Sequence, residues 1–123
     1  MTKTLTVLGR ILFSAIFIAA GPGHFQAQTI ASAAAQGVPM AGIAVPLSGV
    51  IAVLGGLSIA LGIKVRWGAW LIVLFLVPVT VMMHRFWGLS DPQAAMLQQI
   101  MFMKNLSMLG GALVLTQTGC PKA

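Results

Sequence analysis

Acidic residues are almost absent from this sequence: Asp91 is the single Asp or Glu among 123 residues. A lone carboxyl side chain excludes chemistry that needs a pair of carboxylates, such as glycoside hydrolysis. Cysteine is equally scarce, because Cys120 is the one cysteine, which excludes an intrachain disulfide and a C-x-x-C redox or zinc motif. The sequence also lacks a serine-hydrolase elbow, a phosphate-binding glycine loop and an H-E-x-x-H motif. We therefore do not expect self-contained hydrolysis.

Charge of either sign is scarce as well. Charged residues make up 7% of the chain and hydrophobic residues 59%, whereas soluble domains have roughly 25% charged residues. The composition predicts a membrane protein with a single domain over residues 1–123. The seven basic residues stand singly or in one short pair, without the run or stripe that follows a phosphate backbone, so we expect the lipid bilayer and no nucleic acid as partner.

Apolar segments at about residues 4–20, 41–63, 67–84 and 93–116 predict an all-α bundle of four transmembrane helices, because about 20 apolar residues cross a bilayer. The first segment ends at "GPGHF", where glycines and a proline remove helix support. Residues 25–38 are rich in alanine and glutamine and are too polar to span, so they predict a short helix or loop at the membrane interface.

The basic residues predict the orientation of the bundle. Five of them fall at three places that four spans would bring to one side: Lys3, Arg10, Lys64, Arg66 and Lys122. The other side carries Arg85. The positive-inside rule therefore predicts that both termini lie in the cytoplasm.

Lys104 and Asn105 are unusual residues for the middle of a membrane helix. An embedded lysine costs about 2.5–3.5 kcal/mol on insertion scales unless it snorkels, pairs or faces an interior cavity. We expect Lys104 to point into the bundle, where Asn105, His84, a ligand oxygen or water would solvate it. The alternative is that the last membrane span begins later, near Met101, so that Lys104 lies at the interface.

The predicted topology brings His24, His84 and Trp87 to the outer end of the bundle, above Lys104 and Asn105. These five residues form the predicted ligand-binding pocket of the outer half. Imidazoles on facing helices are also able to hold haem or copper, and methionine suits Cu(I). The eight methionines form no dense M-x-x-M repeat and are interpreted as core filler, so we expect neither haem nor copper and predict no metal site.

Arg10 lies about six residues into the first predicted span. Its long side chain is expected to reach the cytoplasmic headgroups. Alternatively, it faces inward and marks the cytoplasmic floor of the bundle.

Four stretches of the sequence together resemble the DoxX family of small four-helix membrane proteins: "GRILFSAIFIAAGPGHF", "PLSGVIAVLGGLSIALGIKVRWGAWLIVLF", "MHRFW" and "FMKNLSMLGGALVL". The most specific is F-x-K-N-L-x-x-x-G-G over residues 102–111, supported by L-G-G-x-x-x-x-L-G over residues 54–62. The resemblance carries over to Lys104, Asn105, His84, Trp87 and Arg10. One departure is "IAV" at 51–53, where many relatives have a glutamate, which removes a partner for the buried lysine.

The resemblance implies a four-helix bundle in the inner membrane of a bacterial cell and an association with thiosulfate:quinone oxidoreduction or with membrane complexes that handle thiol oxidative stress. We predict a redox-linked or quinone-associated subunit that acts with another membrane oxidoreductase subunit or as a homo-oligomer. In it, Lys104, Asn105 and His84 would hydrogen-bond a quinone carbonyl, since a quinone needs an apolar slot and a few donors. The alternative is a non-catalytic accessory or anchoring subunit of a larger membrane complex. The sequence leaves open whether the chain itself catalyses a reaction.

Overall fold

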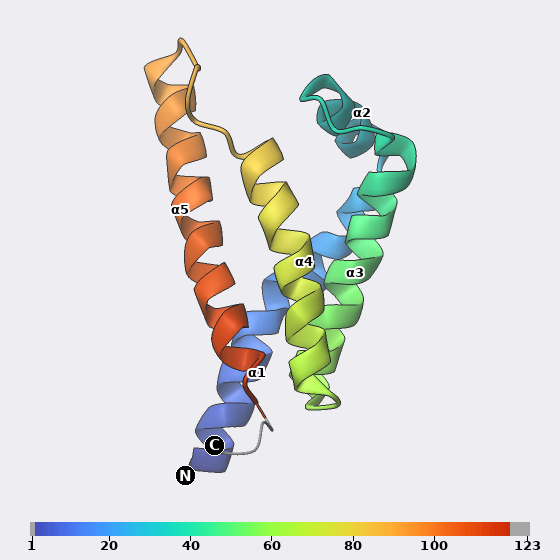
Figure 1. The fold of residues 1–123 in the computed structure, drawn as a ribbon, viewed down its shortest axis with the longest axis vertical. Helices are drawn as coiled ribbons and strands as arrows, with labels where there is room; N and C mark the ends of the chain where they lie inside the picture. The colour runs from blue at the N-terminus through green and yellow to red at the C-terminus, as the bar shows by residue number, and fades with distance from the viewer. Residues whose placement is uncertain (1, 119–123) are drawn as a thin grey trace.

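The computed structural model describes residues 2–118, and all of their regular secondary structure is helical (Figure 1). The elements in chain order are α1 (Thr2–Ala20), the 3-10 helix η1 (Gly21–Phe25), α2 (Ala27–Ala35), α3 (Ala41–Leu61), α4 (Val65–Met83) and α5 (Pro92–Leu115). The four long helices begin and end within about two residues of the segments predicted from apolarity. Local apolar runs therefore determine where each helix begins and ends.

Within residues 2–118, three helical stretches are long and apolar enough to cross a membrane: Lys3–Phe25, Ala41–Leu61 and Val65–Met83. The helix α5 has 24 residues but does not meet the same criterion, because Lys104, Asn105 and several glutamines make it less apolar. The prediction of an all-α membrane protein is thus confirmed. The fourth span and the common side of the two termini stay predictions.

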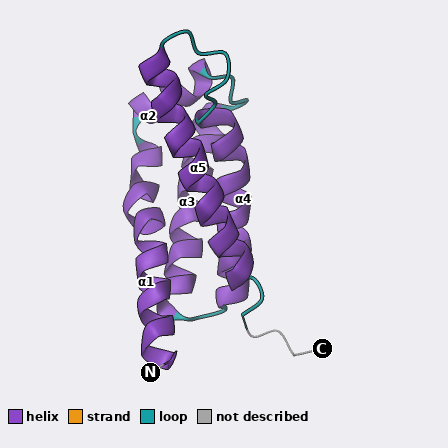
Figure 2. Cartoon of the chain, turned by 90° about the vertical axis from the view of Figure 1, so that its left-hand side faces the viewer, coloured by secondary structure: helices purple, strands orange, loops and turns teal. Residues whose placement is uncertain are grey.

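The long helices lie side by side, with α3 between α1 and α4 and with α5 packed against α4 (Figures 1 and 2). The helix α5 ends at the end of the bundle where α1 begins. The short elements η1 and α2 lie at the opposite end and contact α3. This arrangement puts three connected elements, η1, α2 and the start of α3, beside the last turns of α4.

Glycines allow the close approach of α3 to its two neighbours. A Cβ atom at Gly56 would lie 2.9 Å from Cγ1 of Ile18 on α1, and one at Gly55 would lie 2.9 Å from the carbonyl oxygen of Gly68 on α4. In lipid, helices associate mainly through such close packing, since lipid and apolar side chains attract one another equally well. The core around these contacts contains Phe17, Ala52, Ile59, Ala69, Ile72, Leu76 and Ala112.

Candidate functional site

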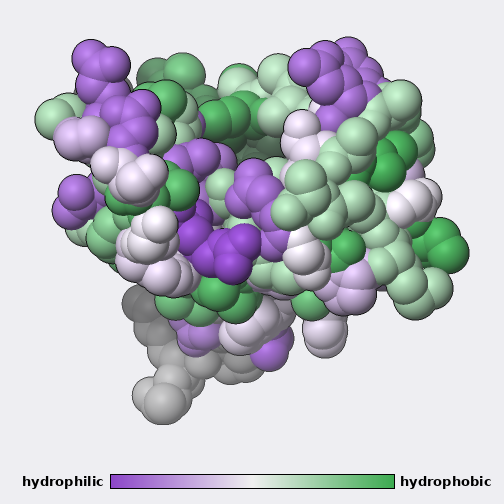
Figure 3. Space-filling model, turned by 90° about the horizontal axis from the view of Figure 1, so that it is seen from above, coloured by the Kyte–Doolittle hydropathy of each residue, from purple (hydrophilic) through white to green (hydrophobic). Residues whose placement is uncertain are grey.

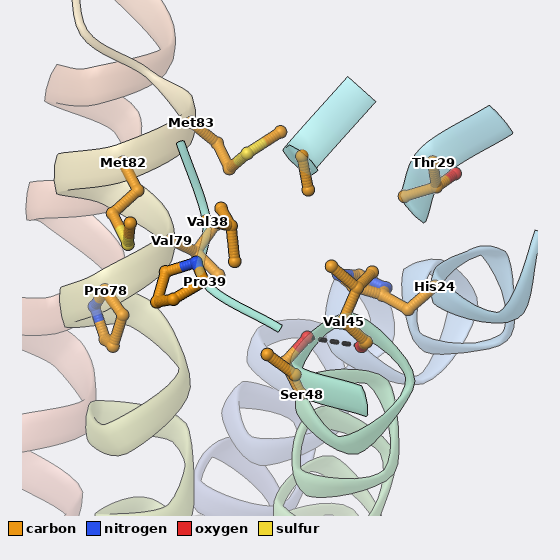
Figure 4. A pocket seen from close by; sticks show the side chains of 12 residues that line it. His24, Thr29, Val38, Pro39, Val45, Ser48, Pro78, Val79, Met82 and Met83 are labelled. Carbon is orange, nitrogen blue, oxygen red and sulfur yellow. Dashed lines mark hydrogen bonds between the residues drawn. The ribbon is translucent and has the colours of Figure 1, made fainter. Parts of the chain in front are cut away.

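A largely apolar cavity of about 250 Å³ lies at the η1 and α2 end of the bundle. Side chains of α4 line one side of it, and η1, α2, the 36–40 linker and α3 line the other (Figure 4). Three of its lining residues are polar, namely His24, Thr29 and Ser48. The other nine are apolar, namely Ala33, Val38, Pro39, Ala44, Val45, Pro78, Val79, Met82 and Met83. An apolar cavity with a few polar groups is the usual form of a small-molecule site.

Two glycines bring His24 to this cavity. A Cβ atom at Gly49 would lie 2.6 Å from the carbonyl oxygen of Gly21 and 2.7 Å from Cβ of His24, so both glycines are needed for η1 to rest directly on α3. The imidazole then packs edge-on against Phe75, with 5.5 Å between the ring centroids and 67° between the planes. His24 is held from two sides, by α3 beneath it and by the ring of Phe75.

The hydrogen bond of His24 determines what its ring offers to a ligand. Nδ1 lies 3.1 Å from the main-chain oxygen of Ala20. A carbonyl oxygen accepts hydrogen bonds and does not donate them, so Nδ1 carries the proton of this bond. In the neutral imidazole, Nε2 is then an acceptor. His24 therefore presents a hydrogen-bond acceptor to an O–H or N–H group.

Two hydroxyl residues, Ser48 and Thr29, also line the cavity. The Ser48 hydroxyl donates to the main-chain oxygen of Val45 at 2.6 Å, so its remaining lone pairs accept. The hydroxyl of Thr29 is able to donate or to accept. Neither residue was predicted from the sequence, because an isolated hydroxyl in a helix usually bonds to its own backbone and carries no signal of a ligand site.

Arg85, which follows α4, is hydrogen-bonded to the end of α2, the helix that covers the cavity. Its Nη2 donates a hydrogen bond of 2.7 Å to the main-chain oxygen of Gln36, where α2 ends. Together with Trp87, Leu89 and Gln98, these two residues line a separate, more polar hollow of about 410 Å³. Hydrophilic side chains gather across the middle of this end of the molecule, between more apolar regions (Figure 3).

His84 and Trp87 do not line the cavity, and Trp87 lines the separate polar hollow instead. His84 ends α4, and its Nδ1 lies 2.9 Å from Oε1 of Gln98, so it joins α4 to α5. Trp87 packs edge-on against Phe86 and Phe102, with centroids 5.4 and 5.9 Å apart, and is 51% exposed. Of the predicted outer pair of histidines, His24 therefore lies on the cavity wall and His84 supports the junction of α4 with α5.

Lys104 and Asn105 face different directions. Asn105 is 5% exposed, whereas the Lys104 side chain is exposed on the surface of the chain. The expectation that Lys104 points into the bundle is therefore wrong. The helix α5 begins at Pro92, where Asp91 caps it by accepting a 3.1 Å hydrogen bond from the Gln93 amide. Because α5 does not meet the criterion for a membrane-crossing helix, the alternative of a span that begins near Met101, with Lys104 at the interface, stays a prediction. Neither Lys104 nor Asn105 lines the cavity.

Arg10 lies near the middle of α1, 14 residues before His24, and is half-buried. A Cβ atom at Gly62, the residue that ends α3, would lie 3.0 Å from an Nη atom of Arg10. The guanidinium thus rests against the C-terminal end of α3, where the helix dipole favours a cation. The buried Nε atom of Arg10 has no hydrogen-bonding partner among the described residues. Arg10 and the cavity are separate features.

Comparison with known families and proteins gives one match. The sequence model of the family DoxX matches residues 5–85, which contain most of α1 and all of η1, α2, α3 and α4, and therefore every residue that lines the cavity. The match ends before α5, so the stretch from Phe102 to Gly111 that the sequence analysis took as the most specific element lies outside it. Neither the curated proteins nor the solved structures contain a significant match to the chain.

Proposed function

We propose that this chain, which belongs to the DoxX family of membrane proteins, binds the headgroup of a quinol in the cavity beside His24 and acts as a redox-linked membrane subunit. The observation that carries the proposal is the hydrogen bond from His24 Nδ1 to Ala20, which leaves Nε2 as an acceptor at a largely apolar wall. Ser48 adds a second acceptor. Acceptors match the hydroxyl groups of a quinol better than the carbonyl oxygens of a quinone.

The size of the cavity supports a ring-sized ligand. Drug-sized ligands occupy sites of roughly 300–1,000 Å³, and this cavity of about 250 Å³ falls just below that range. Pro78, Val79 and Met82 offer flat and flexible apolar surfaces from α4. A single aromatic ring would lie between them and His24, with its isoprenoid tail directed to the lipid.

Each residue would have a separate role in this site. When a partner protein oxidises a bound quinol, two electrons and one proton pass to the partner protein, and the other proton passes to His24. His24 Nε2 accepts the hydrogen bond of one hydroxyl and receives its proton as that hydroxyl is oxidised. Ser48 orients the ring, and the bond between Arg85 and Gln36 keeps α2 over the site and excludes water. His24 returns to its neutral form by releasing the proton to the outer aqueous side.

The proposal includes the topology that the sequence predicts. In it α5 is the fourth span, which is supported by its 24 residues and by its packing against α4. Both termini then lie in the cytoplasm of a bacterial cell, and the cavity lies in the outer half of the inner membrane. The end of the bundle with Lys3, Arg10, Lys64 and Arg66 would be the cytoplasmic end.

Calorimetric titration tests the proposal with the full chain in lipid nanodiscs and a short-chain ubiquinol kept reduced under anaerobic conditions. His24→Phe keeps the ring packing against Phe75 and removes both nitrogens, and His84→Phe is the matched control outside the cavity. We expect His24→Phe to weaken quinol binding about tenfold, which corresponds to one lost hydrogen bond in an apolar site. His84→Phe should change it less than about twofold.

A second variant tests the location of the site. Ala44→Leu adds bulk to the cavity wall and should abolish binding of quinol and quinone alike. The proposal fails if His24→Phe binds the quinol as the wild type does, or if the wild type shows no preference for quinol over quinone. Loss of binding in Ala44→Leu with full binding in His24→Phe would place a ligand in the cavity without recognition by the histidine, which also contradicts the proposal.

A non-catalytic accessory or anchoring role is the second candidate. The exposed position of Lys104 in the middle of α5 favours it, because a cation facing lipid calls for a partner. The two roles are compatible in one protein, since the cavity and α5 are different parts of the bundle.

A further inference from the structure

We infer that the face of α5 around Lys104 is a docking surface for a membrane-spanning helix of another protein, and that this helix carries a carboxylate at the depth of Lys104. The inference does not rest on quinol binding, because no residue of α5 lines the cavity. It rests on the proposed position of α5 as the fourth span, on the geometry of α5 and on the distribution of charge in the sequence.

The helix α5 carries two parallel stripes of residues at alternating spacings of three and four. The first stripe, with Met101, Asn105, Met108 and Ala112, is buried or partly buried. The second is the neighbouring stripe of Leu97, Ile100, Lys104 and Ser107, whose side chains are all exposed. This spacing is the pattern by which two helices pack along a seam. The side chains of the first stripe pack within the chain, whereas those of the second stripe stay exposed.

Lys104 lies near the midpoint of this open stripe. It stands 12 residues after Pro92 and 11 before Leu115, which is about 18 Å and about 17 Å along the axis at 1.5 Å per residue. With α5 as the fourth span and its two ends at the membrane surfaces, a lysine stem does not cover such a distance, and the ammonium does not reach the headgroups on either side. A lipid phosphate is therefore a poor partner for Lys104.

The chain itself offers no carboxylate at that depth. Asp91, the single acidic side chain of the sequence, precedes Lys104 by 13 residues, or about 20 Å along α5, and it caps the helix. A second copy of the chain would place its own Asp91 at an end of its α5, in a parallel or an antiparallel pair. The compensating charge must come from a different protein, on a helix that also packs against Leu97 and Ile100.

Fluorescence transfer in phosphatidylcholine vesicles tests the inference. The full chain carries a donor at Cys120, the one cysteine of the sequence, and the probes are two synthetic leucine-alanine helices with an acceptor that differ in one central residue, glutamate or glutamine. We expect the glutamate helix to bind about tenfold more tightly than the glutamine helix. Lys104→Gln should remove this preference, and Lys104→Arg should keep it.

Two apolar variants test where the probe binds. Ile100 and Leu113 are similarly exposed, at 56% and 45%, but Leu113 lies on a different face of α5. Ile100→Ala should weaken binding of the glutamate helix several-fold, and Leu113→Ala should not. A change from both variants alike would overturn the proposed surface.

Three other results overturn the inference. The first is equal binding of the two helices to the wild type. The second is a preference for glutamate that survives in Lys104→Gln. The third is transfer between two copies of the labelled chain that disappears in Lys104→Gln, which would make a second copy the occupant. His24→Phe should bind the glutamate helix as the wild type does, which separates failure of this inference from failure of the quinol proposal.

Discussion

Arg85 donates a hydrogen bond of 2.7 Å from Nη2 to the main-chain oxygen of Gln36, a residue 49 positions earlier in the chain. Gln36 caps the C-terminal end of α2, and a cation at this end complements the unpaired carbonyls and the dipole of the helix. Because α2 covers the cavity, this bond links the loop after α4 to the cover. The bond adds to the packing of Met83 against Ala33, Ala41 and Val45, which also joins the two sides of the cavity.

Arg85→Met should loosen the cover without unfolding the bundle. An exposed bond to a charged group contributes about 1 kcal/mol, so local opening of α2 should become about five times more frequent. Hydrogen exchange measured by mass spectrometry should show faster exchange over residues 27–36. Arg66→Met, at the other end of α4, is the control and should leave this segment unchanged. Equal exchange in wild type and Arg85→Met would show that packing alone holds α2.

Gly49→Ala should destabilise the protein by about 1–3 kcal/mol, because the added Cβ atom has no space between Gly21 and His24. Gly110→Ala is the matched control, since a Cβ atom there meets nothing within 4 Å. In a helix interior that change should stabilise by about 0.5–1 kcal/mol. Thermal unfolding in detergent measures both. A neutral Gly49→Ala would mean that η1 does not rest on α3 as closely as described.

Asn105→Leu should leave the free energy of unfolding unchanged or raise it by about 1 kcal/mol at most. Asn105 is 5% exposed and stands between Met101 and Met108 in the stripe of α5 that packs within the chain. Transfer of a polar amide to an apolar seam is unfavourable, and leucine suits this stripe. Thermal unfolding of the wild type and of Asn105→Leu, measured side by side, shows whether the variant gains or loses stability. A clear loss of stability in Asn105→Leu would indicate a water or ligand held by the amide.

The two termini should lie on the same side of the membrane. With α5 as a fourth span, an enzyme reporter fused to the N-terminus and one fused to the C-terminus should both be active in the cytoplasm of a bacterial host. Three spans would place the two reporters on opposite sides. Expression of both fusions with a periplasm-specific and a cytoplasm-specific reporter distinguishes the two topologies.

The sequence by itself determined the class of the protein and the positions of its long helices. Long apolar runs separated by glycine, proline and charged residues are local signals, and the hydrogen bonds of a helix are local as well. The limits of α1, α3, α4 and α5 therefore follow from composition. The sequence also showed that Lys104 needs a partner or a route to water, since a cation in an apolar run is visible without a structure.

Tertiary structure alone decided which residues meet. Neighbours on a helix differ by about 100° in direction, so Lys104 and Asn105 could not both enter the seam, and the packing of α5 on α4 selected Asn105. The cavity likewise depends on the contact of Gly21 with Gly49, which are far apart in the sequence. Such contacts depend on the shape of the facing helix. For this reason the sequence indicated His24 as a site residue but gave no sign of Ser48 or Thr29 beside it.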